Sequence, residues 1–195
     1  MVSIGILGEI DCGKTSCFRT FSDILEEKGD RVLKKLPGGG PADDGREKIT
    51  TITVDFLRFT YQGFIHVLYG TGGHKNPSTT YYRDYVLRNA SRFLCIVDLS
   101  ADLEGQLVFF NIANIPTKNV VLIFNKFDLA PENFKSYKEK SIDFFKNDIG
   151  VMIPEFYPTI GIPKDEDEFK KYNQNCFNAI ISLCAQDKPG YGSFF

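Results

Sequence analysis

The chain has 195 residues, of which 43% are hydrophobic and 25% are charged. These values are typical of one globular domain with a sizeable core, so we expect a single domain over residues 1–195. The formal net charge is −2 and there is no long basic or acidic block, so the composition offers no electrostatic basis for a nucleic-acid partner.

Predicted strands and helices alternate along the chain. Short apolar runs that end at turn residues predict buried strands, and longer stretches with helical spacing predict helices. The predicted strands are 2–7, 51–61, 64–69, 93–98, 120–125 and 151–157, and the predicted helices are 14–28, 80–89, 103–114, 134–147 and 165–185.

The order of these elements predicts the fold class. Alternating strands and helices favour an α/β fold, with a mostly parallel sheet of about six strands and helices on both faces. Gln62-Gly63 joins two predicted strands, so we expect a hairpin that adds one antiparallel edge strand. Residues 29–50 contain a Gly- and Pro-rich stretch without a clear period, which predicts a mobile loop. In such sheets, ligands bind at the carboxyl ends of the strands.

The chain ends and the cysteines predict a protein without a membrane anchor. The apolar run 93–97 is far shorter than the roughly 20 residues that span a bilayer. We expect no signal peptide, because an apolar strand follows Met1 directly, and no lipidation, because the ends lack the motifs for it. The five cysteines form no CxxC or Cys/His cluster, which favours reduced thiols in a cytoplasmic protein.

The first predicted strand runs into a phosphate-binding loop. Residues 8–15, GEIDCGKT, match G-x-x-x-x-G-K-[ST], with a strand before them and a helix after them. Gly8 and Gly13 allow the backbone N–H groups to wrap around phosphates, and the helix adds its positive end. Lys14 is expected to contact the β- and γ-phosphates, and the Thr15 hydroxyl to bind Mg²⁺.

A second motif follows the predicted strand 120–125. Residues 125–128, NKFD, match N-K-x-D. The Asp128 carboxylate can accept hydrogen bonds from guanine N1–H and from the exocyclic amine, whereas adenine offers no such donor pair. A site built on that bond rejects the analogue by about 10⁴-fold or more. Asn125 is expected to brace the loop and Lys126 to lie over the base, so the motif predicts GTP and GDP as ligands.

Together these motifs resemble those of the Ras-like small GTPases over nearly the whole chain. Residues 51–56, TITVDF, resemble the first switch of Rab-type members, which implies that Thr51 closes on Mg²⁺ and the γ-phosphate. Thr159 stands where the family's Ser-Ala-Lys loop contacts the base. The resemblance implies a nucleotide-binding set of Gly8, Asp11, Cys12, Gly13, Lys14, Thr15, Ser16, Gly73, Asn125, Lys126, Asp128 and Thr159, with Thr15 and Thr51 as metal ligands.

The second switch departs from the family pattern. The family motif is D-x-x-G, and residues 70–73 read GTGG. Gly73 fits and is expected to contact the γ-phosphate, but Gly70 stands where the aspartate that holds a metal-bound water usually is. The bacterial MglA-type GTPases also lack this aspartate, so the chain resembles that prokaryotic branch. Either Asp55 or Asp98 could compensate.

The residue after Gly73 points to a catalytic role. His74 takes the place of the Ras-like glutamine that orients the attacking water, and Gly-x-x-Gly-His resembles the translational GTPases. An imidazole can orient or polarise that water. The catalytic set implied is therefore His74, Lys14 and Thr51, while His66 lies in a predicted strand and is expected to be structural.

Three functions are compatible with these motifs. The first is a guanine-nucleotide-dependent signalling switch with slow Mg²⁺-dependent GTP hydrolysis, which would work with effector and regulator proteins. The second is a pseudo-GTPase scaffold, for which Gly70 is the best support. The third is a P-loop kinase or NTPase acting on a small molecule, with Arg83, Arg88 and Arg92 near its substrate. Charged residues commonly mark a solvated helix face, and we expect these arginines to do so.

Overall fold

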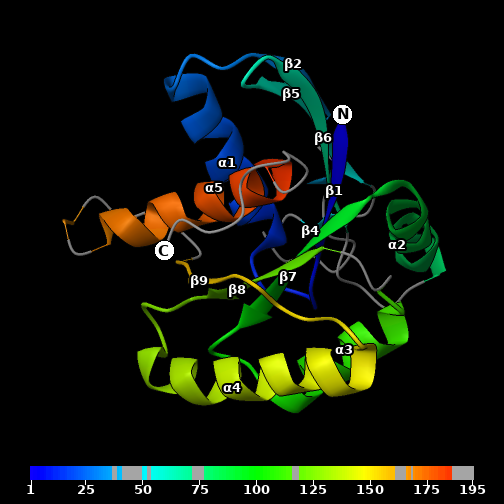
Figure 1. Ribbon diagram of the computed structural model, residues 1–195, viewed down its shortest axis with the longest axis vertical. Coiled ribbons are helices and arrows are strands. Elements are labelled where there is room, and N and C mark those ends of the chain that lie inside the picture. The colour runs from blue at the N-terminus through cyan, green and yellow to red at the C-terminus, as the bar shows by residue number, and fades with distance from the viewer. Residues whose placement is uncertain are drawn as a thin grey trace.

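A computed structural model describes residues 1–36, 39–40, 50–51, 54–71, 77–115, 119–160, 166–167 and 169–185. Within these residues a seven-stranded sheet carries helices on both faces (Figure 1). Its strands are β1 (Val2–Leu7), β2 (Val32–Leu36), β5 (Asp55–Tyr61), β6 (Phe64–Gly70), β7 (Arg92–Asp98), β8 (Val120–Asn125) and β9 (Phe156–Pro158). The helices are α1 (Lys14–Glu27), α2 (Pro77–Asn89), α3 (Leu103–Ala113), α4 (Phe134–Phe144) and α5 (Lys170–Ala185). A separate ladder pairs β3 (Gly39–Gly40) with β4 (Thr50–Thr51).

The strand order places the predicted motifs at one edge of the sheet. The order is β2-β5-β6-β1-β7-β8-β9, and the strands from β6 to β9 pair in parallel. The α/β fold class is therefore confirmed. The carboxyl ends of β1, β6, β7 and β8 lie at the same edge, and β5, which is antiparallel to β6, begins there.

The hairpin between β5 and β6 forms as expected. Gln62 and Gly63 have φ values of 49° and 79°, and two successive positive φ values suit the twist of a two-residue hairpin turn. This tight turn sets the register in which Asp55 lies opposite Gly70.

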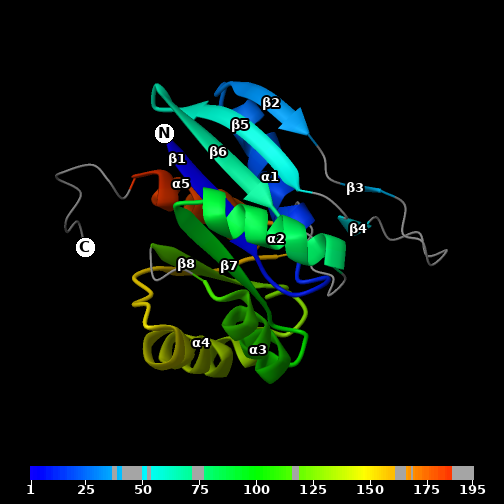
Figure 2. The same cartoon turned by 90° about the vertical axis from the view of Figure 1, so that its right-hand side faces the viewer.

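Two apolar clusters hold the helices on the sheet. One lies between the sheet and helices α1 and α5, and the other between the sheet and helices α3 and α4 (Figure 1). Alternate residues of the strands therefore face different helices: Ile4 and Ile6 belong to the first cluster and Leu7 to the second. Helix α2 packs near β1, where a Cβ on Gly5 would lie 2.7 Å from Cγ1 of Val86 (Figure 2).

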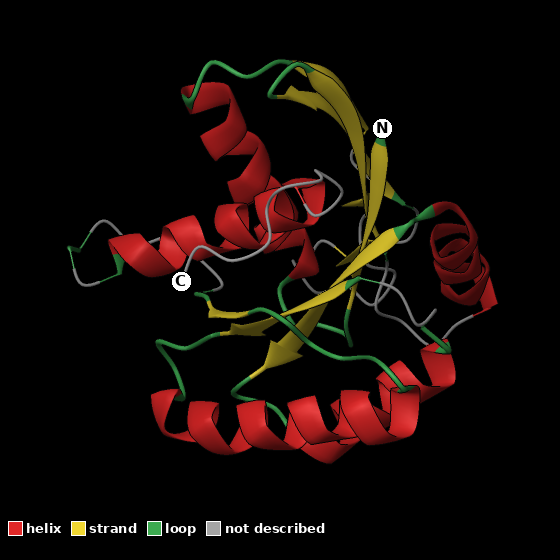
Figure 3. Cartoon of the chain, in the orientation of Figure 1, coloured by secondary structure: helices red, strands yellow, loops and turns green. Residues whose placement is uncertain are grey.

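Several segments differ from the sequence predictions, three of them in the type or extent of structure as follows (Figure 3). Residues 32–36, which were expected in a loop, form β2. Most residues of β2 are exposed, so the sequence has no apolar pattern there, and the strand exists because it pairs with β5. The predicted strand 151–157 reduces to β9, because Val151 packs into the core as irregular chain after Gly150. Helix α4 ends earlier than expected and continues as a π-helical turn, Phe145–Ile149.

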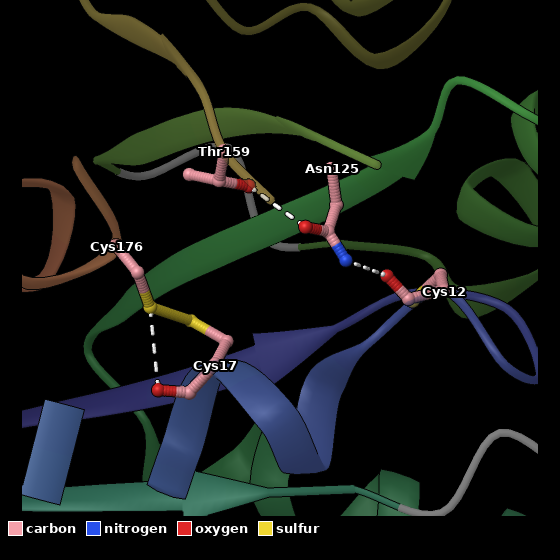
Figure 4. Close-up of a disulfide and its surroundings, with 5 residues drawn as sticks. All are labelled: Cys12, Cys17, Asn125, Thr159 and Cys176. Atoms are coloured by element: carbon pink, nitrogen blue, oxygen red, sulfur yellow. Dashed lines mark hydrogen bonds between the residues drawn. A yellow bond between two sulfur atoms is a disulfide. The ribbon is translucent and has the colours of Figure 1, made fainter. Parts of the chain in front are cut away.

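The expectation of reduced cysteines is wrong for one pair. Cys17 of α1 and Cys176 of α5 form a disulfide, with 6.0 Å between their Cα atoms (Figure 4). Because 159 residues separate them in the chain, their spacing in the sequence carried no signal of this pairing. Among the described residues, no helix combines the length and apolar character that crossing a membrane requires.

Candidate functional site

The loop between β1 and α1 curves tightly around a buried ammonium group. Asp11 and Gly13 have positive φ values of 57° and 98°. The Lys14 side chain is only 7% exposed, and its Nζ donates hydrogen bonds to the carbonyl oxygens of Gly8 at 2.9 Å and Glu9 at 2.5 Å. The loop therefore holds a full positive charge inside its own curve, at the N-terminal end of α1.

Glycine is required at both ends of this loop. A Cβ on Gly13 would lie 2.1 Å from Nδ2 of Asn125, and one on Gly8 would lie 2.5 Å from Sγ of Cys12 and 2.9 Å from the carbonyl oxygen of Ile96. The close approach of neighbouring groups, together with the positive φ of Gly13, thus accounts for both glycines of the motif.

Asn125 joins the phosphate loop to two other segments (Figure 4). Its Nδ2 donates to the carbonyl oxygen of Cys12 at 2.8 Å, and its Oδ1 accepts from Oγ1 of Thr159 at 3.0 Å. The backbone of Thr159 also donates to the carbonyl oxygen of Phe124 at 2.8 Å and accepts from N–H of Phe127 at 3.0 Å. The structure therefore brings the phosphate loop, the N-K-x-D segment and Thr159 into one hydrogen-bonded group.

Lys126 is held by a carboxylate that the sequence did not connect with it. Its φ is 60°, and its Nζ lies 2.5 Å from Oδ2 of Asp98. The other oxygen of Asp98 accepts from the N–H and the hydroxyl of Ser100, at 2.8 and 2.7 Å. Both carboxylate oxygens of Asp98 are thus engaged beside the N-K-x-D turn. The sequence did contain one signal for this role, because the buried strand β7 ends in Asp98 at the sheet edge where the carboxyl ends of β1, β6, β7 and β8 lie.

The expected magnesium ligands can be tested against the groups at this edge. Thr15 lies in the first turn of α1 and is half-buried, and β5, which begins at the same edge of the sheet, carries the buried Asp55 as its first residue. A hydroxyl and a carboxylate are oxygen donors of the type that Mg²⁺ takes, usually with water and phosphate oxygens. In the described part of the chain, no group of three or more His, Cys, Asp or Glu side chains could hold a metal ion. The fit to Mg²⁺ rests on the oxygen donors of Thr15 and Asp55, to which a phosphate ligand and water would add the remaining oxygens.

Several predicted site residues are placed only in part. Asp128 and Ser16 are half-buried at the ligand edge, and Ile10 of the phosphate loop is 39% exposed. Thr51 contributes its backbone to β4, and its side chain lies outside the described part of the structure. Gly73 and His74 also lie outside the described residues.

The arginines do not form the uniform solvated face that we expected. Arg92 is fully buried at the start of β7, where it donates to the carbonyl oxygen of Leu183 at the end of the sheet away from the phosphate loop. Arg83 lies over the ring of Phe109 at 5.8 Å. Arg88 alone is exposed. Burial and ring packing thus give two of these arginines structural roles.

The thiol inside the phosphate loop is not an activated nucleophile. Burial raises the pKa of Cys12 above its ordinary value of 9.0, and this outweighs the opposite effect of the Lys14 ammonium. The thiol is therefore protonated at neutral pH and serves as a small filler above Gly8.

No protein-family model matches the sequence, and no curated protein matches it. Solved structures do resemble it. The translation elongation factor SelB from Methanococcus maripaludis, in complex with the GTP analogue GppNHp, has a TM-score of 0.60 at 16% identity; the match covers 100% of this chain and 35% of that one. A bacterial selenocysteine-specific elongation factor, EF-Sec, has a TM-score of 0.64 at 14% identity, with 96% and 29% covered. The nucleolar GTP-binding protein 1 of Plasmodium falciparum has a TM-score of 0.56 at 16% identity, with 93% and 84% covered.

The chain has the fold of a P-loop GTPase. At 14–16% identity the likeness shows the fold alone, and the chain spans about a third of the length of the two elongation factors. This agrees with the GTPase resemblance of the motifs. The MglA-type branch stays a prediction.

Proposed function

We propose that this chain is a single G domain, residues 1–195, that acts as a guanine-nucleotide-dependent switch with slow GTP hydrolysis. The observation that carries the proposal is the hydrogen bond from Asn125 to the carbonyl oxygen of Cys12. It joins a phosphate-binding loop to a base-recognition motif at the ligand edge of a P-loop GTPase fold, so one nucleotide can bind both.

The base is recognised by Asp128, and Lys126 covers it. The carboxylate of Asp128 pairs with the two N–H donors of guanine. Asp98 holds the Lys126 ammonium at 2.5 Å, which restricts the orientations of the lysine stem over the base. An adenine would leave the Asp128 carboxylate without these donors.

The phosphates and Mg²⁺ bind at the other end of the site. Lys14 and the N-terminus of α1 attract the phosphates, and Thr15, with Thr51, would hold Mg²⁺, which screens the negative charge of the phosphates. Gly73 contacts the γ-phosphate, and His74 orients the attacking water. Hydrolysis is slow because the recognised motifs contain no arginine that serves as a finger in cis.

Nucleotide competition tests this proposal directly. Labelled GDP should be displaced by GTP but by ATP only at roughly 10⁴-fold higher concentration. In Asp128→Asn, preference should move to xanthine nucleotides, because the extra carbonyl of xanthine can accept from an amide. If ATP competes as well as GTP, the chain is not guanine-specific and the proposal fails.

A second candidate function is a pseudo-GTPase scaffold, which Gly70 favours because it removes the usual second-switch carboxylate. Single-turnover hydrolysis with and without Mg²⁺ separates the two functions. A switch hydrolyses bound GTP, and His74→Ala slows this step while leaving GTP binding intact. A scaffold binds GTP and leaves it unhydrolysed in both proteins.

We also propose that the switch works with effector and regulator proteins. Because the branched Ile10 is 39% exposed in the phosphate loop, it would crowd an arginine inserted by a partner. An activating protein would then act by setting His74 and the second switch.

A further inference from the structure

The structure suggests what replaces the second-switch aspartate that Gly70 lacks. Gly70 is the last residue of β6, and its pairing partner across the antiparallel ladder is Asp55, the first residue of β5. Both residues are buried, and Asp55 is only 4% exposed. A carboxylate therefore enters the site from the neighbouring strand.

The Asp55 carboxylate occupies the space above Gly70. A Cβ on Gly70 would lie 3.0 Å from Cβ of Asp55 and 3.2 Å from its Oδ2. These separations are tighter than an ordinary van der Waals contact, so a side chain at position 70 would crowd Asp55 and push it aside by a few tenths of an ångström. The two positions are thus adjacent places from which a carboxylate can enter the same space, and in this chain the carboxylate comes from β5.

The carboxylate also faces the helix that begins at the phosphate loop. Leu57 and Phe59, which alternate with Asp55 along β5, pack in the same cluster as Phe18 and Phe21 of α1. Ile6, the register partner of Gly70 on β1, belongs to that cluster as well. Asp55 therefore lies on the α1 face of the sheet, at the edge where α1 begins with Lys14 and Thr15.

The other carboxylate that could compensate is engaged elsewhere. Asp98 accepts from Lys126 at 2.5 Å and from Ser100 at 2.7 and 2.8 Å, beside the base-recognition turn. Asp98 thus lies at the base-recognition turn and Asp55 on the α1 face of the sheet, so their places in the fold separate the two aspartates that the sequence left equivalent.

We propose that Asp55 supplies the acidic group that Mg²⁺ would use together with the Thr15 hydroxyl, in place of the side chain missing at Gly70. This inference rests on the proposed function, because Mg²⁺ would bind with the nucleotide phosphates. Mg²⁺ keeps several waters and needs only one or two protein carboxylates, so a carboxylate delivered from β5 meets its requirement.

The test is the Mg²⁺ dependence of GDP release from the full chain. The release rate of a fluorescent GDP is measured in excess Mg²⁺ and in EDTA for the wild type, Asp55→Asn and the control Asp98→Asn. In the wild type, Mg²⁺ should slow release. Asp55→Asn should reduce this slowing, measured as the ratio of the release rates in EDTA and in Mg²⁺, by at least about tenfold, and any effect common to both conditions cancels in that ratio. Asp98→Asn should speed release equally in both conditions.

Moving the carboxylate provides the second test. Gly70→Asp alone should be destabilised, because its side chain meets Asp55. Asp55→Gly combined with Gly70→Asp should restore the slowing by Mg²⁺, and circular dichroism should show that the double variant is folded. Wild-type Mg²⁺ dependence in Asp55→Asn, or a folded double variant that releases GDP as fast in Mg²⁺ as in EDTA, would overturn the inference. Failure of the wild type to bind GDP in either condition would instead overturn the proposed function.

Discussion

At Gly13, both the backbone conformation and the close approach of the Asn125 side chain require glycine. Its φ is 98°, and its Cα faces the Asn125 amide so closely that an added Cβ would lie 2.1 Å from Nδ2. Gly29 and Gly63 share the positive φ, 77° and 79°, but a Cβ at either would meet nothing within 4 Å. The chain thus contains its own controls for separating backbone strain from steric contact.

Gly13→Ala should weaken guanine-nucleotide binding. The new methyl group must displace Asn125 and so break its hydrogen bond to Cys12, in addition to a backbone strain of about 1–3 kcal/mol. We expect GDP affinity to fall by at least about tenfold, the loss for one hydrogen bond of about 1.4 kcal/mol. Calorimetric titration measures it, with Gly29→Ala as the matched control, which carries the strain alone and should bind GDP normally. Equal affinity in the two variants would mean that the Asn125 contact has no effect on binding.

At the scale of elements, α1 and α5 are the helices whose packing the disulfide fixes. Cys17 and Cys176 link them covalently, and the rings of Phe21 and Phe177 stack beside this link with centroids 5.5 Å apart. Because α1 begins directly after the loop of residues 8–13, the bond ties the helix that follows this loop to α5.

Reducing this disulfide should destabilise the protein. A bridge over a long loop restricts the unfolded chain, and its loss typically costs about 2–4 kcal/mol. Denaturant unfolding with and without reductant measures the loss of unfolding free energy. Reductant should have no effect on the stability of Cys176→Ser, which lacks the bond, and should destabilise the control Cys184→Ser as much as the wild type. Alkylation of the unreduced, denatured protein should modify three thiols, Cys12, Cys95 and Cys184. Modification of all five would show that the bond does not form in the purified protein.

At the scale of the whole molecule, a buried histidine couples global stability to pH. His66 of β6 is buried against Phe59, with ring centroids 5.5 Å apart. Burial lowers the pKa of His66 below 6.5, and the positive charges of the chain's N-terminus and Arg92 lower it further, against a backbone hydrogen bond with Tyr61 that raises it. The folded state therefore favours the neutral imidazole.

The free energy of unfolding should fall as the pH drops below about 6.5. The unfolded chain takes up a proton at His66 near its ordinary pKa of 6.5, whereas the folded chain resists it. The stabilisation is fully present above that pH and declines below it, with a slope of at most about 1.4 kcal/mol per pH unit. This slope is measured by urea unfolding of the wild type, His66→Leu and His74→Ala between about pH 5 and pH 8. That range extends at least about one pH unit to each side of the ordinary histidine pKa. The slope should be lost in the first variant and kept in the second; the reverse result would assign it to His74.

Much of the fold follows from local patterns. The buried strands β1, β7 and β8 are short apolar runs, and the glycine at position 63 marks the hairpin, so these elements are predictable from neighbouring residues. β2 is not, because most of its residues are exposed and it exists by pairing with β5. Val151 shows the opposite case: its apolar side chain led to a predicted strand, but it is buried in irregular chain, because burial alone does not make a strand.

The sequence by itself determined the G-x-x-x-x-G-K-[ST] and N-K-x-D motifs and the sheet edge at which they meet, because each motif is a short segment of adjacent residues that follows a predictable strand. Only the tertiary structure decided which distant side chains join them. Asp98 pairs with Lys126, Asp55 covers Gly70 and Cys17 bonds to Cys176, and in each case the partners lie on different elements. Strand register and helix packing bring these groups together, and neither is encoded in the spacing of the residues along the chain.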